Sequence, residues 1–359
     1  MSYSPFRHTG SVFWKRSPIQ LTFFLTKRCN ARCSFCFYRS EGEILKGNDT
    51  ELSFWEIENI SASMGKLLWL AFSGGEIFLR DDIVEITKVF YEKNKPAIIL
   101  FPTNGLLTDI IREKLETVLQ YCRNSTVVVK LSLDGPEHIH DIIRGRKGSF
   151  QKTMQTYESV GRLLDRYPNF ELGINTVYCS ANQDCMDELI EFVSRLDRIK
   201  THTVSLVRGQ GLEEIDIERY RETIDMLAGN LRKKISGMYR FRGGRLKAAQ
   251  DILQRRLIYD TETQKKKLIE CYAGRLNLVL TETGDIYPCE SFSMKMGNVR
   301  DNKYNIKEMM RSRQVHTVQS SIKDSGCFCS HECYLMTNIL FSIRMYPRLM
   351  KEYFRLTGH

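Results

Sequence analysis

The amino-acid sequence predicts an α/β fold, a partial (β/α)6 barrel of the TIM type followed by a small cysteine-rich C-terminal extension. β-rich apolar runs alternate with segments of helical periodicity six times within the first 210 residues, which is the pattern of βα units around a parallel sheet. Six units are too few to close an eight-stranded barrel, so an open one is expected. Five of the eleven cysteines lie in the last quarter of the chain, which marks the extension.

The individual elements follow from the spacing of apolar residues along the chain. The predicted strands are residues 20–25, 68–72, 97–101, 127–133, 171–177 and 203–207. The predicted helices are residues 53–65, 82–93, 108–123, 150–167 and 183–196. Residues 1–210 are assigned to the barrel, the charged and helix-like residues 211–270 to a bridging segment, and residues 271–359 to the extension, where residues 276–280 and 284–287 predict a hairpin.

Composition limits the class of protein. An apolar fraction of 42% and a charged fraction of 27% are ordinary for a globular chain. The longest apolar runs, such as residues 67–72, are far shorter than the roughly 18 residues that cross a bilayer. Lys27, Arg28 and Cys29 follow the N-terminal apolar run where a signal peptide would need small residues, so a cytoplasmic location is expected. In that reducing compartment, eleven cysteines indicate metal binding or catalysis rather than disulfides.

Three cysteines form a tight loop directly after the first predicted strand, with the spacing Cys29-x3-Cys33-x2-Cys36. A 4Fe-4S cluster normally takes four cysteines, so three leave one iron open to a ligand from outside the protein. A structural zinc site usually takes four nitrogen or sulfur ligands, and no nearby histidine supplies the fourth. We therefore interpret Cys29, Cys33 and Cys36 as cluster ligands and, through the open iron, as catalytic residues.

This loop resembles the signature of the radical S-adenosylmethionine (radical SAM) superfamily, including the aromatic Phe35 before the third cysteine. The resemblance covers roughly the first 210 residues. It implies that the open iron binds the amino and carboxylate groups of S-adenosylmethionine, and that Phe35 packs near the adenine. The segment Ser73-Gly74-Gly75-Glu76 is similar to the family motif that holds the methionine amino group. Glycines allow close backbone approach to a ligand and a carboxylate pairs with an ammonium, although an ordinary strand-to-helix turn has the same composition.

Further cofactor-binding candidates follow from the same resemblance. Ser132 and Asp134 resemble the polar end of the family's fourth strand, which is expected near the ribose and carboxylate of the cofactor. Asn175 and Arg144 are two more candidates, and each could equally be a structural hydrogen-bonding residue or a surface charge.

The extension resembles a SPASM or twitch domain, which carries auxiliary iron-sulfur clusters. The resemblance lies in Cys271-x12-Gly284-x4-Cys289, followed by Cys327-x-Cys329-x3-Cys333. These cysteines are too few for two fully ligated clusters, so one auxiliary cluster of the 4Fe-4S type is expected, held by Cys271, Cys289, Cys333 and either Cys327 or Cys329. A zinc ribbon with the same thiolates is the alternative. His331 is either a further ligand or a solvated side chain.

The resemblance implies an enzyme that cleaves S-adenosylmethionine reductively and uses a 5′-deoxyadenosyl radical to take hydrogen from a peptide or small-molecule substrate, with an external electron donor such as flavodoxin or ferredoxin. Two alternatives stay open. Residues 335–356 mix apolar and basic side chains, as a membrane-surface helix acting on a lipid would, but Pro347 interrupts them, and packing on the barrel explains them equally. The net charge of +10 also fits a non-enzymatic zinc or iron-sulfur module that binds nucleic acid, although the Gly-Gly-Glu segment then has no role.

Overall fold

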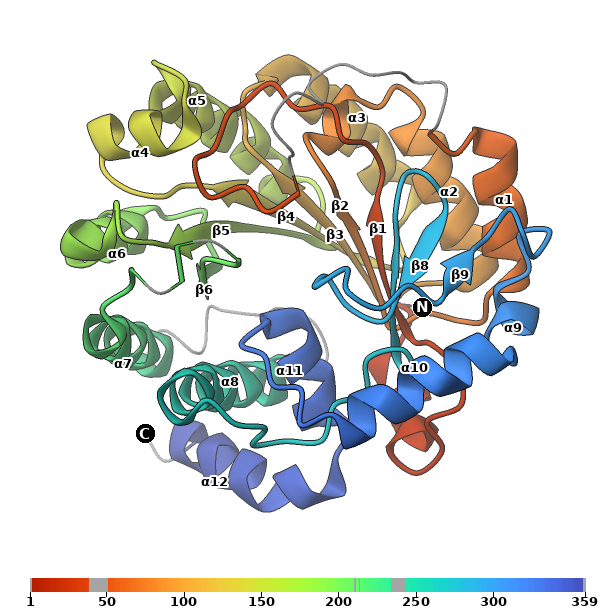
Figure 1. The fold of residues 1–359 in the computed structure, drawn as a ribbon. Coiled ribbons are helices and arrows are strands. Elements are labelled where there is room, and N and C mark those ends of the chain that lie inside the picture. The colour runs from red at the N-terminus through yellow and green to blue at the C-terminus, as the bar shows by residue number, and fades with distance from the viewer. Residues whose placement is uncertain (1, 39–50, 210, 213, 234–242, 358–359) are drawn as a thin grey trace.

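A parallel sheet of six βα units forms the centre of the computed structural model, which describes residues 2–38, 51–209, 211–212, 214–233 and 243–357 (Figure 1). Its strands are β1 (Gln20–Phe24), β2 (Trp69–Ser73), β3 (Ile98–Thr103), β4 (Thr126–Ser132), β5 (Phe170–Tyr178) and β6 (Thr201–Leu206). They lie side by side in sequence order, each parallel to the next. All six predicted strands are present, so the expected open (β/α)6 architecture is confirmed.

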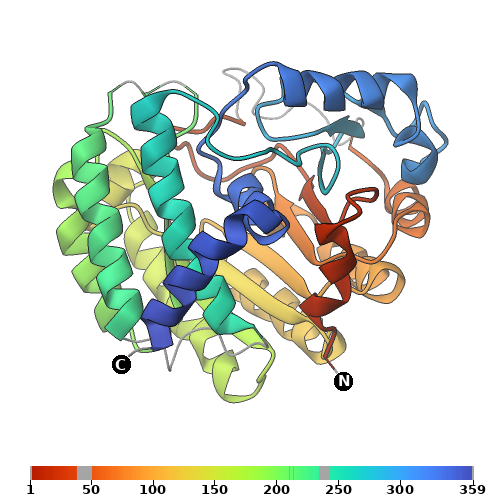
Figure 2. The ribbon, with the colours of Figure 1, turned by 90° about the horizontal axis from the view of Figure 1, so that it is seen from below.

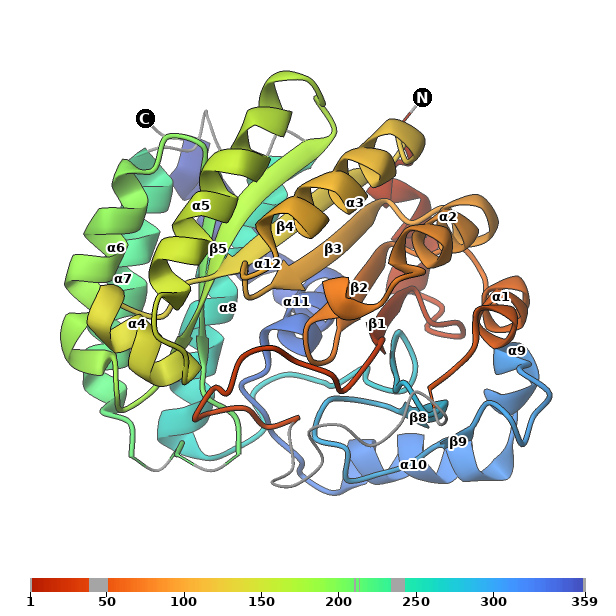
Figure 3. The same cartoon turned by 90° about the horizontal axis from the view of Figure 1, so that it is seen from above.

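The helices of these units cover the outer face of the sheet, as Figure 3 shows from above. They are α1 (Phe54–Ser63), α2 (Ile83–Asn94), α3 (Thr108–Tyr121), α4 (Glu137–Arg144), α5 (Ser149–Gly161) and α6 (Met186–Arg195). α1 begins with a capping box, in which Ser53 and Glu56 each bond the other's backbone amide. The helix predicted at residues 150–167 is α5 continued by the 3-10 turn Arg162–Asp165. The sequence analysis did not predict α4: Ile139, Ile142 and Ile143 have helical spacing, but eight residues are shorter than the stretch over which a period is recognised.

The extension continues the same sheet. β7 (Asn277–Leu280) pairs parallel to β1, with Leu21 opposite Leu278, and β8 (Asp285–Tyr287) and β9 (Gly297–Asn298) follow antiparallel. The predicted hairpin is therefore present as β7 and β8, and it adds to the edge of the barrel sheet at β1. The helices that follow are α9 (Ile306–Met309), α10 (Arg313–Asp324), α11 (Glu332–Leu340) and α12 (Tyr346–Thr357).

Two helices join the barrel to the extension, α7 (Ile217–Lys233) and α8 (Gly244–Gln264). α8 packs against α7, α11 and α12, and it lies with α11 across the open side of the barrel (Figure 1). The helical character predicted for the bridging segment is confirmed, while the domain boundaries at 210 and 270 stay predictions.

The C-terminal segment is broken into two helices, α11 and α12, as Pro347 in the first turn of α12 led us to expect. Leu349 and Leu356 of α12 are buried in one cluster with Leu253 and Leu257 of α8, and Figure 2 shows the two helices together from below. This packing accounts for part of the apolar residues that suggested a membrane-surface helix, while Ile343, Met350 and Phe354 are exposed. Within the described ranges, none of the helices combines the length and apolar character needed to cross a bilayer.

Candidate functional site

A cavity of about 400 Å³ lies inside the partial barrel, between the inner face of β1 to β6 and the helices α8 and α11. Its size is that of a small-molecule site. The cavity wall includes the thiols of Cys29, Cys33 and Cys36, which the loop after β1 presents. Since parallel strands end at one edge of the sheet, this wall also collects residues that follow β2, β3 and β4.

The cysteine loop is held in place by the end of α4. The backbone amides of Arg32 and Ser34 donate to the carbonyls of Arg144 (2.9 Å) and Ile143 (3.0 Å). Gly145 ends α4 in the left-handed conformation, at φ +59°, and a Cβ there would lie 2.6 Å from the carbonyl oxygen of Arg32. Only glycine combines that backbone conformation with that close approach. Gly145 therefore allows the end of α4, a helix that the sequence analysis did not predict, to contact and support the cysteine loop.

Two of the three thiols receive N–H donors. Arg144 Nη1 lies 3.4 Å from the Sγ of Cys33, and Asn104 Nδ2 lies 3.9 Å from the Sγ of Cys29. Burial raises the pKa of Cys29 to about 11; it also raises that of Cys33, against the lowering effect of the Arg144 charge. Cys29 and Cys33 are therefore protonated in the absence of a ligand, and metal binding has to release their protons. Asn104 was not among the predicted site residues.

Gly74 and Gly75 pack directly against the cysteine loop. The Gly75 amide donates to the Thr26 carbonyl at 2.7 Å, and a Cβ on Gly75 would lie 2.0 Å from the carbonyl oxygen of Arg28. The sequence argument assigned these glycines to close approach of a ligand. In the structure both line the cavity, and the close approach that forbids a side chain is to the backbone of the loop itself.

Glu76 is fully buried at the cavity wall and accepts three hydrogen bonds. The donors are the hydroxyl of Thr103 at 2.9 Å, the amide of Asn104 at 2.8 Å and the amide of Phe78 at 3.2 Å. Burial raises the pKa of Glu76 to about 6 in spite of these donors. The carboxylate thus joins the ends of β2 and β3, and it is placed where a bound ammonium would lower its pKa.

Ser132, the last residue of β4, is in register with Asn175 within β5, and both line the cavity. Asp134 does not belong to the cavity wall. Its buried carboxylate accepts from Arg144 Nε at 2.6 Å and from the Val177 amide at 2.9 Å. Arg144 itself reaches the wall, with its guanidinium 5.5 Å from the centre of the Phe35 ring. The structure therefore places Asp134 behind Arg144 rather than beside a cofactor.

The extension brings four thiols into one another's electrostatic reach. Cys271 precedes β7, Cys289 follows β8, and Cys327 and Cys329 lie before α11. Burial raises the pKa of Cys329 to about 12, and the neighbouring groups Cys271, Cys289 and Cys327 raise it further. These four include both Cys327 and Cys329, of which the sequence analysis expected only one to be a cluster ligand.

Cys333 stands apart from these four thiols. Burial raises its pKa to about 12, and the charges that act on it most are those of Glu290, Arg208 and Glu332. It lines the barrel cavity in the first turn of α11. His331 is half-buried rather than solvated: burial lowers its pKa to about 3, and its Nδ1 has no hydrogen-bond partner among the described residues. Over the part of the chain that the structure describes, no three His, Cys, Asp or Glu side chains gather as closely as a single metal ion requires.

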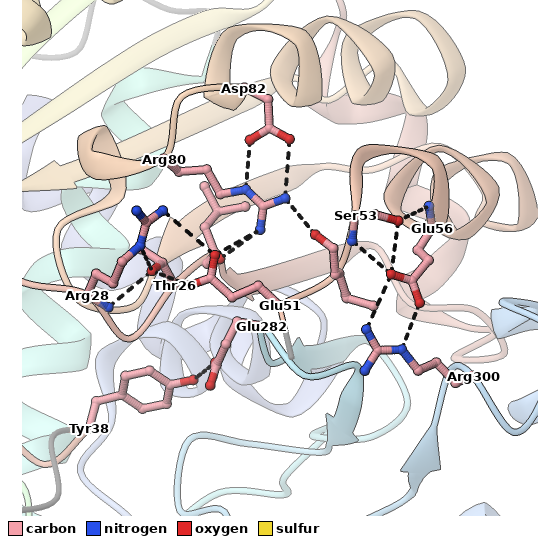
Figure 4. A network of polar contacts seen from close by, with 12 residues as sticks. Thr26, Arg28, Tyr38, Glu51, Ser53, Glu56, Arg80, Asp82, Glu282 and Arg300 are labelled. Atoms are coloured by element: carbon pink, nitrogen blue, oxygen red, sulfur yellow. Dashed lines mark hydrogen bonds and ion pairs between the residues drawn. The ribbon is translucent and has the colours of Figure 1, made fainter. Parts of the chain in front are cut away.

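Polar contacts tie the cysteine loop to the extension (Figure 4). The hydroxyl of Tyr38, just beyond the third cysteine, donates to Glu282 in the β7–β8 turn, and Lys27 lies 3.9 Å from the same carboxylate. Arg300, which follows β9, pairs with Glu56 in the first turn of α1 at 2.7 Å. The loop and the hairpin are therefore held as one unit.

Arg208 makes a second connection, which could not be predicted from the sequence, where it is only a basic residue after a strand. Its guanidinium pairs with Glu290 and, at 3.4 Å, with Glu332, and it lies 5.3 Å from the centre of the Phe37 ring. Burial would lower the pKa of Arg208, but the two carboxylates outweigh it and raise the pKa. This buried cation joins the cysteine loop to residues that adjoin Cys289 and Cys333.

Comparison with protein families agrees with this geometry. Residues 23–193 match the radical SAM superfamily, and residues 271–334 match the SPASM iron-sulfur cluster-binding domain. Residues 23–193 therefore form a radical SAM domain, and residues 271–334 form a SPASM domain. The two matches contain the first cysteine set and the second, respectively, so both parts of the resemblance noted in the sequence are confirmed.

Curated relatives are similar to this radical SAM chain over most of its length. The subtilosin biosynthesis protein AlbA of Bacillus subtilis is 26% identical over 83% of this chain and 61% of its own length. The sporulation killing factor maturation protein SkfB of the same species is 25% identical over 79% and 63%. The chain thus spans about three fifths of the length of these relatives.

Solved structures of radical SAM proteins share the fold. The protein anSMEcpe with bound AdoMet has a TM-score of 0.60 at 18% identity, covering 95% of this chain and 98% of that one. SuiB of Streptococcus suis bound to S-adenosylmethionine has a TM-score of 0.60 at 15% identity, covering 92% and 73%. At these identities the likeness shows a common fold.

The residues at the two sites fit the groups that a radical SAM protein with a SPASM domain holds. At the first site, three thiols share one wall with a buried carboxylate and with the N–H donors of Arg144 and Asn104, which suit a sulfur-rich anion. At the second, four thiols influence one another electrostatically, and the backbone of His331 hydrogen-bonds to Cys329.

Proposed function

We propose that the protein is a radical SAM enzyme that abstracts hydrogen from a peptide. In this proposal Cys29, Cys33 and Cys36 hold a 4Fe-4S cluster with one open iron, and a second cluster occupies the extension. When bound, the first cluster and S-adenosylmethionine supply reductive cleavage of the sulfonium and a 5′-deoxyadenosyl radical. The observation that carries the proposal is the presence of all three thiols on the wall of one cavity inside the barrel.

The side chains around that cavity then have distinct tasks. Glu76, Gly74 and Gly75 bind the amino group of the cofactor, and Phe35 faces its adenine. Ser132 and Asn175 donate and accept hydrogen bonds to its ribose and carboxylate. Arg144 contacts the cofactor side of the cavity and balances the charge of the Cys33 thiolate. Asp134 acts through Arg144, as a positioning residue. The enclosing helices α8 and α11 exclude water from a reactive intermediate.

For the auxiliary cluster, we propose Cys271, Cys289, Cys327 and Cys329 as the ligands, with Cys333 as the further candidate. The mutual electrostatic influence of the first four supports that set. Cys333 lines the cavity, and Cys327 and Cys329 precede it by a few residues, so a cluster held by these thiols would suit an electron acceptor for a substrate radical. An external carrier such as flavodoxin or ferredoxin supplies the electron for the first cluster.

The names of the relatives support a peptide substrate. AlbA is a bacteriocin biosynthesis protein and SkfB a maturation protein, and one structure of SuiB holds its precursor peptide SuiA. A small molecule is the second candidate, because haem synthases are also among the relatives. The alternatives of a lipid substrate and of a nucleic-acid-binding module find no support in these comparisons, and α12 buries part of the apolar face that suggested the lipid.

The test is anaerobic reconstitution with iron and sulfide, followed by dithionite and S-adenosylmethionine. We expect 5′-deoxyadenosine to form even without substrate, as an uncoupled product. The Cys33→Ala variant is the control that lacks the open iron and should form none. Wild-type protein that carries its full iron content and still forms no 5′-deoxyadenosine would refute the enzyme proposal.

A further inference from the structure

Lys130 places an amine inside the barrel, two residues before the end of β4. It lines the cavity, and its Nζ donates to the hydroxyls of Thr201 and Thr203 (3.2 Å for Thr203) and lies 3.4 Å from the Thr201 carbonyl. All of these acceptors are uncharged. A lysine inside a protein is ordinarily paired with a carboxylate, because an unpaired buried charge is costly.

The described part of the chain places no such counter-ion beside Lys130. Over the described residues, no carboxylate comes within 4.0 Å of Lys130 Nζ. Glu171 of β5 and Asp251 of α8 raise its pKa from a greater distance, but Asp251 is already paired with Lys247. Burial has the largest effect and lowers the pKa of Lys130 to about 7.

The neighbouring strand leaves space for this amine. Gly173 lies in the middle of β5, where a Cβ would come 2.6 Å from Lys130 Nζ and 2.5 Å from the Thr201 hydroxyl. Glycine inside a strand weakens it and often marks a place where another group approaches closely. Here the group that approaches is the lysine amine. Glycine at position 173 weakens β5, but it leaves room for the Lys130 amine at the cavity wall.

The same cavity has an apolar side. Trp69, Leu100 and Val128 line it from β2, β3 and β4, opposite Lys247, Asp251 and Gln254 of α8. The cavity also reaches Ser132 and Asn175, the residues assigned above to the cofactor. Val128 and Lys130 are two residues apart on β4 and so share its inner face, and a molecule that fills the space beside the cofactor therefore meets apolar carbon with the Lys130 amine next to it.

We propose that Lys130 binds a carboxylate of the substrate, carried on an apolar stem. This inference rests on the proposed function, since it places that substrate beside the cofactor. A carboxylate suits the site better than a phosphate, because Glu171 and Asp251 also line the cavity and repel a dianion more strongly than a monoanion. The hydroxyls of Thr201 and Thr203 accept the remaining hydrogen bonds of the Lys130 amine. The carboxylate comes either from an acidic residue of a peptide or from a small organic acid.

Binding should depend on pH in a defined direction. The carboxylate binds the ammonium form of Lys130, whose pKa is about 7 without ligand, so affinity is highest below pH 7 and falls about tenfold per unit above it. The charged and titratable groups facing Lys130 are Glu171 on β5, His202 on β6, and Lys247, Asp251 and Arg255 on α8. Burial lowers the pKa of His202 to about 3, so it stays neutral in this range.

The test is calorimetric titration of the anaerobic protein, loaded with S-adenosylmethionine, using two matched pairs of probes. One pair is the blocked tripeptide Leu-Glu-Leu and its Leu-Gln-Leu analogue, and the other is 4-phenylbutanoate and its amide. We expect the acid to bind about 10- to 100-fold more tightly than the amide in at least one pair. The pair with the larger preference identifies the source of the carboxylate.

Two variants complete the design. Lys130→Met should lose the preference for the acid. The matched Lys114→Met removes a lysine that donates to the carbonyls of Phe78 and Arg80, outside the cavity wall, and should keep the preference.

If Lys130→Met does not fold, the pH profile of the wild type decides, because only binding of the acid should weaken above pH 7. Equal binding of acid and amide, no binding of any probe, or an acid preference that survives in Lys130→Met overturns the inference. Probe binding needs no turnover, so a preserved acid preference without 5′-deoxyadenosine overturns the proposed function alone.

Discussion

The guanidinium of Arg144 lies between Cys33 and the buried carboxylate of Asp134, with Nη1 3.4 Å from the cysteine sulfur and Nε 2.6 Å from the carboxylate. Burial would lower the pKa of Arg144, and Asp134 together with Cys33 raises it instead. The arginine is therefore charged at any pH at which the protein folds, and a cysteine of the first set always has a cation beside it.

Arg144→Met should destabilise the protein by about 3–5 kcal/mol, because it leaves the Asp134 carboxylate buried without its partner. The measurement is urea unfolding of the reduced apo-protein. Adding Asp134→Asn to Arg144→Met should recover part of the loss, since the remaining group is then neutral. A change below about 1 kcal/mol for Arg144→Met would show that this pair contributes little.

Gly75→Ala should prevent the cysteine loop from taking its place, because the new Cβ would lie 2.0 Å from the Arg28 carbonyl oxygen. Overpacking of this kind typically costs about 1–3 kcal/mol, and more where backbone must move. Iron content after reconstitution is the second readout, and it should fall by about four per chain. Gly65→Ala is the control, since no atom lies within 4 Å of a Cβ built there and the variant should behave as the wild type.

Glu76 should make the apo-protein less stable as the pH rises from about 4.5 to about 6. Its pKa is raised to about 6 in the folded chain by burial, from 4.5, so the folded state holds the proton more tightly and stability is lost as the carboxylate ionises. The shift corresponds to about 2 kcal/mol. The measurement is the difference in unfolding free energy between wild type and Glu76→Gln across this range. Parallel curves for the two proteins would contradict the prediction.

The two cysteine sets should lose iron independently. Cys33→Ala should remove about four irons per chain and abolish 5′-deoxyadenosine formation, whereas Cys289→Ala should remove a separate four and leave uncoupled cleavage. Iron analysis and product chromatography measure both. Cys122→Ala, at a buried cysteine in the core away from both sets, is the control and should retain all of the iron. Full iron content in both Cys33→Ala and Cys289→Ala would mean that the ligands are assigned wrongly.

The strands were predictable because each is a short, continuous apolar run bounded by polar turns, as in β1, whose five residues are all buried. The helix α4 was not, because its eight residues between Pro136 and Gly145 are shorter than the stretch over which a period is recognised, although its isoleucines have helical spacing. Nor does any local pattern say that β7 pairs with β1, since residues 277–280 and 20–23 lie far apart in the chain. Pairing of that kind is selected by the packing of the whole sheet.

At the site, the residue types were predictable and their partners were not. The spacing of Cys29, Cys33 and Cys36 is local, so the sequence already places three thiols on one loop. Whether Asp134 faces a cofactor or an arginine depends on how α4 returns to the sheet, and the structure turns it toward Arg144. The proposed role of Lys130 could not be predicted for the same reason. A lysine in a strand is expected to be exposed, and its position beside Gly173 and Thr201 is known only from the structure.

By itself, the sequence determined the class of chemistry: thiols in two sets, a loop with three of them, and six alternating units that form a parallel sheet. These are properties of neighbouring residues, and they hold however the distant parts meet. The tertiary structure alone decided which groups face the cavity, which carboxylates pair with arginines, and which amine has no carboxylate within ion-pair distance among the described residues. Those outcomes depend on contacts between segments far apart in sequence, whose geometry is set by strand register and by the packing of helices across the barrel.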